Sequence, residues 1–127
     1  MYLVDTNIFL EILLTQEKQK VCRKFLEVNF GSLYISDFSL HSIGVILFRN
    51  NKENIFKTFL KDIIPNLEIT TLPKMSYEDL ADVKKKLGLD FDDAYQYQVA
   101  RERDLKIVTM DKDFKKIGNK ADILYIE

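Results

Sequence analysis

Apolar and polar residues along this chain follow two periods, one typical of strands and one typical of helices. Short runs rich in apolar residues, such as residues 2–4 and 106–109, have the length of buried strands. Longer stretches repeat apolar residues every three or four positions, as amphipathic helices do. About five short strands are predicted in this way, at residues 2–4, 33–35, 67–72, 106–109 and 123–126.

Helices are predicted between these strands, and local signals mark several of their ends. Ser36 or Asp37 is suited to cap the helix that follows the second strand. Pro65 ends a later helix, and Gly88 fits the C-terminus of another. The predicted helices span about residues 7–14, 17–29, 38–49, 53–64, 76–87 and 91–103, with one or two helical turns at 112–117.

The alternation of strands and helices predicts an α/β fold. Strands that alternate with helices pair in parallel and are joined by right-handed crossovers. The chain has 127 residues, contains no Pro- or Gly-rich linker, and is long enough to bury a core. We therefore expect a single domain over residues 1–127, built as a three-layer α/β/α sandwich around a central parallel sheet.

Composition narrows the possible functions without choosing one. The net charge of −1 gives no general attraction to nucleic acid, so local basic patches would have to supply such contacts. The single cysteine, Cys22, excludes an internal disulfide and suits a reducing compartment. No apolar run approaches the roughly 20 residues that span a bilayer, and Asp5 comes too early for a signal peptide. We expect a cytoplasmic protein without a membrane partner.

Acidic residues stand at the ends of two predicted strands. Asp5 follows the first strand and Asp111 follows the strand at 106–109. Open α/β folds hold their ligands at the carboxyl edge of the sheet, so these carboxylates are expected to converge there. Asp93 is a third candidate for this acidic site. It lies in the first turn of the predicted helix that precedes the strand at 106–109. Converging carboxylates repel one another, and a bound Mg²⁺ or Mn²⁺, which prefers oxygen ligands, would relieve that repulsion.

A divalent ion at such a site predicts phosphodiester hydrolysis, because a metal-activated water is a nucleophile for phosphorus. Each acid also has a simpler interpretation. Asp5 fits the cap of the first helix, Asp90 the cap of the helix that carries Asp93, and Asp113 the cap of the short helix after it. Asp92 fits a solvated acid at a helix N-terminus. Sequence alone leaves these alternatives open.

Taken together and in order, these motifs resemble the PIN domain family. The matching segments are Asp5-Thr6-Asn7 after the first strand, Asp93-Ala94 at the start of a helix, and Thr109-Met110-Asp111-Lys112-Asp113-Phe114 near the end. The resemblance covers nearly the whole chain and is greatest with the small VapC-type toxins of prokaryotic toxin–antitoxin pairs. It implies a metal-dependent endoribonuclease that uses Mg²⁺ or Mn²⁺, with RNA as its substrate.

The resemblance also implies roles for individual residues and partners. The catalytic, metal-binding acids would be Asp5, Asp93 and Asp111. The supporting residues would be Thr6, Asn7, Thr109 and Asp113, with Thr6 or Asn7 hydrogen-bonded to Asp5 or to water and Thr109 orienting the segment around Asp111. Family toxins are typically neutralised by a small antitoxin protein and often form homodimers, so both partners are implied here.

One position departs from the family pattern. PIN nucleases usually carry a glutamate on the helix after the second strand, about six residues beyond a strand-end Ser or Thr. Ser36 sets the register here, so the expected acid falls on Ser42, beside the only histidine, His41. Either His41 faces the site as a metal ligand or proton shuttle, or the site has only three of its usual four acids. The alternative function is therefore a catalytically weakened PIN module that binds RNA or a protein partner without cleavage.

Basic and aromatic residues give a second, weaker indication of nucleic-acid contact. Lys112, Lys115 and Arg101 are predicted to hold substrate phosphates around the acidic site. Tyr95 and Tyr97 fit either base stacking or core packing. Cations near helix C-termini also fit an ordinary solvated helix face, since the helix dipole favours them there.

Overall fold

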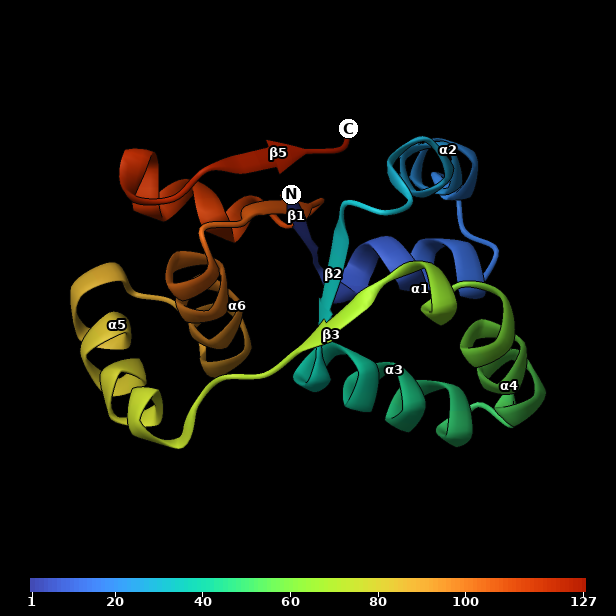
Figure 1. Cartoon of the computed structure of the whole chain (residues 1–127), viewed down its shortest axis with the longest axis horizontal. Helices are drawn as coiled ribbons and strands as arrows, with labels where there is room; N and C mark the ends of the chain where they lie inside the picture. Colours follow the sequence, from blue (N-terminus) through green and yellow to red (C-terminus); the bar gives the residue numbers. More distant parts are fainter.

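Five short strands form one parallel sheet at the centre of the molecule (Figure 1). The computed structural model describes all residues from 1 to 127. The strands lie side by side in the order β3-β2-β1-β4-β5, and each neighbouring pair is parallel. Their bounds are β1 Tyr2–Val4, β2 Leu33–Ser36, β3 Glu68–Thr70, β4 Lys106–Thr109 and β5 Ile123–Tyr125. The predicted parallel sheet of about five short strands is confirmed.

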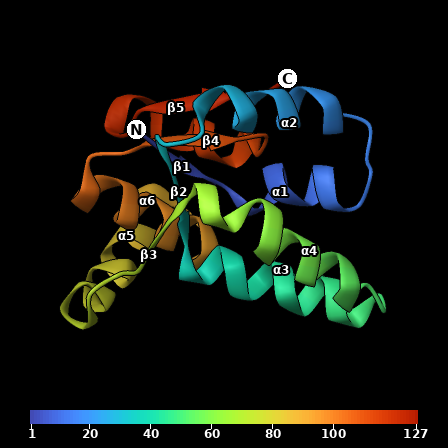
Figure 2. The ribbon, with the colours of Figure 1, turned by 45° about the vertical axis from the view of Figure 1, so that its right-hand side comes forward.

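Helices occupy the connections between the strands, as the patterning predicts. The α-helices are α1 Thr6–Leu13, α2 Gln19–Asn29, α3 Asp37–Arg49, α4 Glu53–Asp62, α5 Asp79–Leu87 and α6 Phe91–Arg103. The shorter 3₁₀ helices are η1 Ile64–Asn66, η2 Lys74–Glu78 and η3 Lys112–Lys120. Helices α1 to α4 lie on one side of the sheet, and α5 and α6 lie on the other (Figures 1 and 2).

The two faces of the sheet bury two separate hydrophobic cores. Successive side chains of a strand point to opposite faces, so Leu3 packs into the core under α5 and α6 while Val4 packs into the core under α1 to α4. Cys22 is buried in the second core, as expected for a small core residue. The arrangement is the predicted three-layer α/β/α sandwich. None of the helices combines the length and apolar character that crossing a membrane requires.

Strand order places a topological switch point between β1 and β4. From β1, the chain crosses to β2 and then β3 on one side, and then returns to β4 on the opposite side of β1. Ligands of open α/β sheets bind at the carboxyl ends of the strands at such a point, because the connecting helices diverge and leave a crevice. Asp5 follows the last residue of β1, and Asp111 lies two residues beyond the end of β4. The fold therefore brings both acids to one crevice.

Several predicted boundaries differ from the observed ones by one to three residues, and three of these differences have clear local reasons. The helix predicted to begin at Ser76 begins at Asp79, because the segment before it winds as the 3₁₀ helix η2. The helix predicted to reach Ile64 ends at Asp62, and Pro65 belongs to the 3₁₀ turn η1. The third strand ends at Thr70 because the backbone N–H of Leu72 donates to the hydroxyl of Tyr95 rather than to a neighbouring strand.

Candidate metal centre

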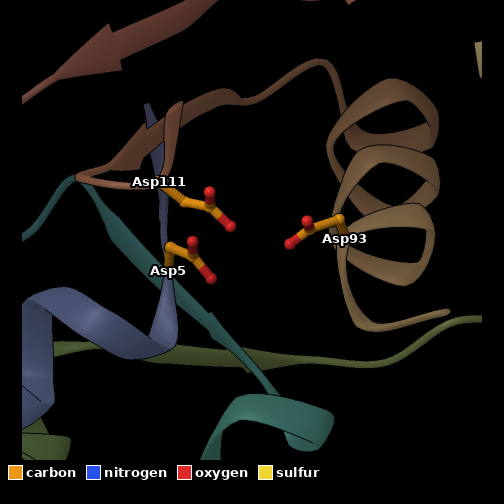
Figure 3. Close-up of side chains that lie close together, drawn as sticks. All are labelled: Asp5, Asp93 and Asp111. Atoms are coloured by element: carbon orange, nitrogen blue, oxygen red, sulfur yellow. The ribbon is translucent and has the colours of Figure 1, made fainter. Parts of the chain in front are cut away.

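Three carboxylates from distant parts of the chain meet at the switch point. Asp5 lies between β1 and α1, Asp111 lies after β4, and Asp93 lies in the first turn of α6. One carboxylate oxygen from each residue lies within 4.8 Å of the others. Figure 3 shows the three carboxyl groups pointing toward one another from their separate elements. The structure therefore brings together the three acids predicted to be catalytic.

Both carboxylate oxygens of Asp5 accept hydrogen bonds. The backbone N–H of Thr6 donates to Oδ1 at 2.8 Å, so Asp5 caps α1, and the Thr109 hydroxyl donates to Oδ2 at 2.7 Å. The amide nitrogen of Gln96 makes a longer contact of 3.3 Å with Oδ1. Burial raises the pKa of Asp5, and these three donors oppose that rise. The two roles that sequence left open for Asp5, helix cap and member of the acidic site, are thus both met by one side chain.

Thr109 links two of the three acids. Its hydroxyl oxygen donates to Asp5 and accepts the backbone N–H of Asp111 at 2.9 Å, so one buried side chain sets both positions. Asn7 supports the same turn, since its Oδ1 accepts the Met110 N–H at 3.3 Å and its Nδ2 lies 3.4 Å from the Thr109 hydroxyl. Thr109 and Asn7 thus both contact the backbone of the turn that carries Asp111.

A second polar network reaches Asp5 from α3. The Gln96 amide donates to Ser39 Oγ at 2.7 Å, and Ser39 also accepts the Thr6 hydroxyl at 2.8 Å. Ser36 caps α3 through the backbone N–H of Ser39. Through this network the predicted supporting residue Thr6 is held by α3, and it reaches Asp5 with its backbone rather than with its hydroxyl.

Asp93 carries the clearest electrostatic signature of the site. Its side chain is only 8% exposed, and burial raises its pKa from the ordinary value of 3.8 to about 7, with the negative charges of Asp111 and Asp5 adding to the rise. No lysine, arginine or histidine lines the cleft that these acids share, a cavity of about 310 Å³. The chain itself thus provides no counter-charge for three carboxylates that approach one another closely.

The other acids near the site play different parts. Asp111 caps η3, because its Oδ1 accepts the backbone N–H of Asp113 at 2.9 Å, so Asp111 is the cap rather than Asp113. The Asp113 side chain is exposed and adds a weak charge effect on Asp93. Asp90 occupies the N-cap position of α6, but its side chain accepts no bond there and does not line the cleft. Asp92 is exposed and lies at the edge of the cleft.

Serine occupies the position on α3 at which the resemblance implies a glutamate. Ser42 lines the cleft together with Asp5, Asp93 and Asp111, whereas His41 is exposed and does not line it. The alternative in which His41 faces the site is therefore wrong. Adjacent residues on a helix point about 100° apart, so the register that places Ser42 in the cleft turns His41 toward solvent. Asp5, Asp93 and Asp111 line the cleft with Asp92 at its edge, and α3 contributes no carboxylate to it.

The predicted phosphate-binding and stacking residues do not gather at the acids. Arg101 lines a different cavity, of about 570 Å³ between α5 and α6, and Lys112 lines another beside the C-terminal residues. The ammonium of Lys115 lies 5.4 Å above the ring of Tyr125. Tyr95 and Tyr97 are both buried, so each packs in the core and neither offers a face to a base.

Gln96 and Ser39 are site residues that sequence reasoning missed. Both are buried and hydrogen-bonded to one another, and Gln96 lines the cleft. A signal for Gln96 was present, since it lies three residues after Asp93 and so falls on nearly the same face of a helix. Ser39 lies three residues after the cap Ser36, the spacing that brings a side chain back to the first turn.

Comparison with known proteins identifies what this arrangement is similar to. The sequence profile of the PIN domain matches residues 2–120. No curated protein sequence matches the chain. The match to the PIN profile confirms the resemblance indicated by the acidic motifs.

Solved structures of toxin–antitoxin proteins share the fold. The VapBC2 complex of Rickettsia felis bound to a promoter DNA fragment superposes with a TM-score of 0.81 at 17% identity, covering 99% of this chain and 98% of that one. DNA-bound VapBC of Salmonella typhimurium gives 0.80 at 17% identity, covering 98% and 96%. The toxin VapC20 of Mycobacterium tuberculosis, which cleaves the sarcin–ricin loop, gives 0.79 at 14% identity, covering 93% and 95%.

Proposed function

The chain belongs to the PIN domain family, and we propose that it is a metal-dependent endoribonuclease that hydrolyses phosphodiester bonds of RNA. The observation that carries this proposal is the convergence of Asp5, Asp93 and Asp111 within 4.8 Å at the switch point of the sheet. Three acids without a basic neighbour are costly unless a cation joins them.

The chemistry of the donors fits Mg²⁺ or Mn²⁺. All three side chains offer carboxylate oxygens, which hard divalent ions prefer, and no sulfur or imidazole ligand lies in the cleft. The buried Oε1 of Gln96 accepts no hydrogen bond from the chain, and water bound to a cation would be a suitable donor. When bound, such an ion activates water as a nucleophile and stabilises the charge that develops on phosphate.

The chain's own residues position the acids for that task. Asp5, Asp93 and Asp111 would hold the ion, and the donors on Asp5 favour its ionised form in a buried place. Thr109 fixes the spacing between Asp5 and Asp111 through bonds to both. Such supporting bonds orient ligand side chains and raise metal affinity.

We further propose that the protein is the toxin of a toxin–antitoxin pair, with a small antitoxin as its partner. The solved structures with the same fold include VapBC complexes, and VapC20 is a toxin that cleaves RNA of the sarcin–ricin loop. At identities of 14–17%, these structures share the fold of this chain. A homodimer and a cytoplasmic location are part of the same proposal.

The direct test is RNA cleavage with Mg²⁺ or Mn²⁺, comparing the wild type with Asp5→Asn and Asp93→Asn. We expect cleavage by the wild type that EDTA abolishes, and a loss of at least a hundredfold in both variants. Asp104→Asn is a matched control, because Asp104 is an exposed acid at the opposite end of α6. Equal cleavage by wild type and both site variants would show that the activity comes from a contaminant or another site.

The second candidate function, a PIN module that binds without cutting, is favoured by Ser42. This residue lies in the cleft where the family usually has a glutamate, so the site has less negative charge to hold an ion. Calorimetric titration with Mn²⁺ separates the two proposals. Binding in the micromolar range supports the nuclease, whereas no heat at millimolar Mn²⁺ supports the binding module.

A further inference from the structure

Two phenylalanines from different helices form a partly exposed aromatic surface beside the acidic cleft. Phe91, the first residue of α6, is 55% exposed, and Phe38, in the first turn of α3, is half-buried. Their ring centroids lie 6.1 Å apart. We call this pair the aromatic platform. One face of such a ring packs on its aromatic neighbour, and the other face stays in water. The face in water does not stabilise the fold, so it is available to a ligand.

The platform is held rigidly from beneath. The buried ring of Tyr95 lies 5.5 Å from the Phe38 centroid and 6.4 Å from the Phe91 centroid. The Tyr95 hydroxyl donates to Asp37 Oδ1 at 2.6 Å and accepts the Leu72 N–H at 3.0 Å. Because two hydrogen bonds hold the hydroxyl of the buried Tyr95 ring, the two phenylalanines that pack on it need little ordering when a planar group binds to them.

The platform is continuous with the acidic cleft. Phe38 lines the same cavity as Asp5, Asp93 and Asp111, and Phe91 precedes Asp92, which also lines it. A chain whose phosphate lay at the three acids would therefore place a neighbouring group over Phe38. Asp37, Asp90 and Asp92 are exposed acids that directly adjoin Phe38 and Phe91 in the sequence. Their negative charges repel a phosphate but do not repel the uncharged face of a base.

We propose that the aromatic platform of Phe38 and Phe91 stacks a nucleobase of single-stranded RNA next to the phosphodiester held at the acids. This proposal rests on the proposed function and deepens it, because it restricts the substrate to RNA with an unpaired base beside the cut. Every base has a π-face, so stacking on phenylalanine holds a base without reading its sequence. Bases within a duplex cannot reach such a surface unless they unstack.

The chain contains no tryptophan, which allows a sharp test. Phe91→Trp places a single fluorescent reporter on the platform, and Phe48→Trp places one at a matched control position. Phe48 is 60% exposed near the far end of α3 and packs against Phe56 rather than at the cleft. Both variants keep the three acids, and Ca²⁺ replaces Mg²⁺ or Mn²⁺ during titration with single-stranded oligoadenylate, so that binding is measured without cleavage.

We expect oligoadenylate to quench the emission at position 91 and to leave the emission at position 48 unchanged. An abasic oligomer of the same length should quench neither. Under the same conditions, Phe91→Ala should weaken binding of labelled oligoadenylate about tenfold, and Phe48→Ala should not change it. Equal responses at both positions, quenching by the abasic oligomer, or no binding at all would each overturn the platform.

The outcomes also separate this proposal from the proposed function. Quenching at position 91 with no RNA cleavage by the wild type would keep the platform and refute the nuclease. Metal-dependent cleavage with no effect of Phe91→Ala on binding would keep the nuclease and refute the platform. A response of the position 91 reporter to a protein partner but not to oligoadenylate would show that the platform is a protein contact, and would refute the stacking proposal.

Discussion

The hydroxyl of Thr109 donates a hydrogen bond of 2.7 Å to Asp5, a residue 104 positions earlier in the chain. The same hydroxyl accepts the backbone N–H of Asp111 at 2.9 Å. One small buried side chain thus joins the end of β1 to the turn after β4, and it fixes two of the three acids relative to one another.

Replacing Thr109 with valine tests this link. Valine keeps the shape of threonine but removes the hydroxyl, so Asp5 loses a donor and the Asp111 N–H loses its acceptor. We expect Mn²⁺ affinity to fall about tenfold or more, the usual effect of losing a bond that orients a ligand. Titration calorimetry measures it. Thr109→Ser keeps the hydroxyl and should retain most of the affinity. Equal affinity in the valine variant would show that Asp5 is positioned by its other bonds.

Replacing Gln96 with leucine tests the second support of Asp5. Leucine fills similar space but makes neither the 3.3 Å contact with Asp5 nor the 2.7 Å bond with Ser39. We expect Mn²⁺ affinity to fall about tenfold. Gln98→Leu is a matched control, because Gln98 is also buried in α6 but bonds to Glu102 and lines a different cavity. Similar losses in both variants would point to general damage to α6.

Sequence predicted Asp5 and Asp111 because their positions depend on strand ends, and strand ends are visible in the pattern of apolar residues. The prediction of Asp93 depended on recognising the start of a helix as well, and the resemblance to the PIN domain supported this prediction. Strand and helix ends do not point to Gln96, and its spacing of three residues from Asp93 was the one signal for it. Every residue of α6 from Asp93 to Ala100 is buried, so this helix shows no polar face from which the orientation of Gln96 could be predicted.

The register of α3 shows a second limit. Spacing from Ser36 placed Ser42 at the expected acid position, but a shift of one residue would have placed His41 there. Helix periodicity alone did not decide whether Ser42 or His41 faces the site, because α3 has apolar residues on several sides and a weak polar face. The packing of α3 against the sheet decided it, and such packing involves residues far apart in sequence. Boundaries that depend on one tertiary bond escape prediction for the same reason. An example is the end of β3 at Thr70, beyond which the Leu72 N–H bonds to Tyr95.

Ser42→Glu tests whether a carboxylate at this position of α3 strengthens metal binding in the cleft. Ser42 lines the cavity of the three acids, so a glutamate there would add a carboxylate within reach of a bound ion. We expect Mn²⁺ affinity to rise about tenfold. His41→Glu adds the same charge one position earlier on the exposed side of α3, and it should leave affinity unchanged. Equal gains in both variants would mean that overall negative charge, rather than position, controls the binding.

Tyr95→Phe tests the scaffold beneath the platform. The change removes a bond of 2.6 Å to Asp37 and leaves the Leu72 N–H without its acceptor inside the protein. We expect the free energy of unfolding in urea to fall by about 1–3 kcal/mol, the cost of an unpaired buried donor. Tyr97→Phe serves as control, because Tyr97 is also a buried tyrosine of α6 and has neither of these two hydrogen bonds. A fall of similar size in both variants would contradict the scaffold role.

The acidity of Asp93 gives the metal-free protein an unusual dependence of stability on pH. Its pKa rises from 3.8 to about 7 on folding, because burial and the charges of Asp111 and Asp5 favour the protonated form. Between these two values the unfolded chain has released the proton and the folded chain still holds it. Stability of the metal-free protein should therefore fall as pH rises from about 4 to 7, by roughly 2 kcal/mol once partial screening by solvent is allowed for.

Urea unfolding in EDTA at several pH values measures this slope. Asp93→Asn cannot ionise, so its stability should change less over the same range and should exceed that of the wild type at pH 7. Asp92→Asn is the control, since Asp92 is exposed beside Asp93 and its loss should leave most of the slope in place. Saturating Mn²⁺ should remove the decline, because an ion stabilises the charged carboxylates that burial disfavours. A wild-type protein whose stability is level from pH 4 to 7 in EDTA would refute this account of Asp93.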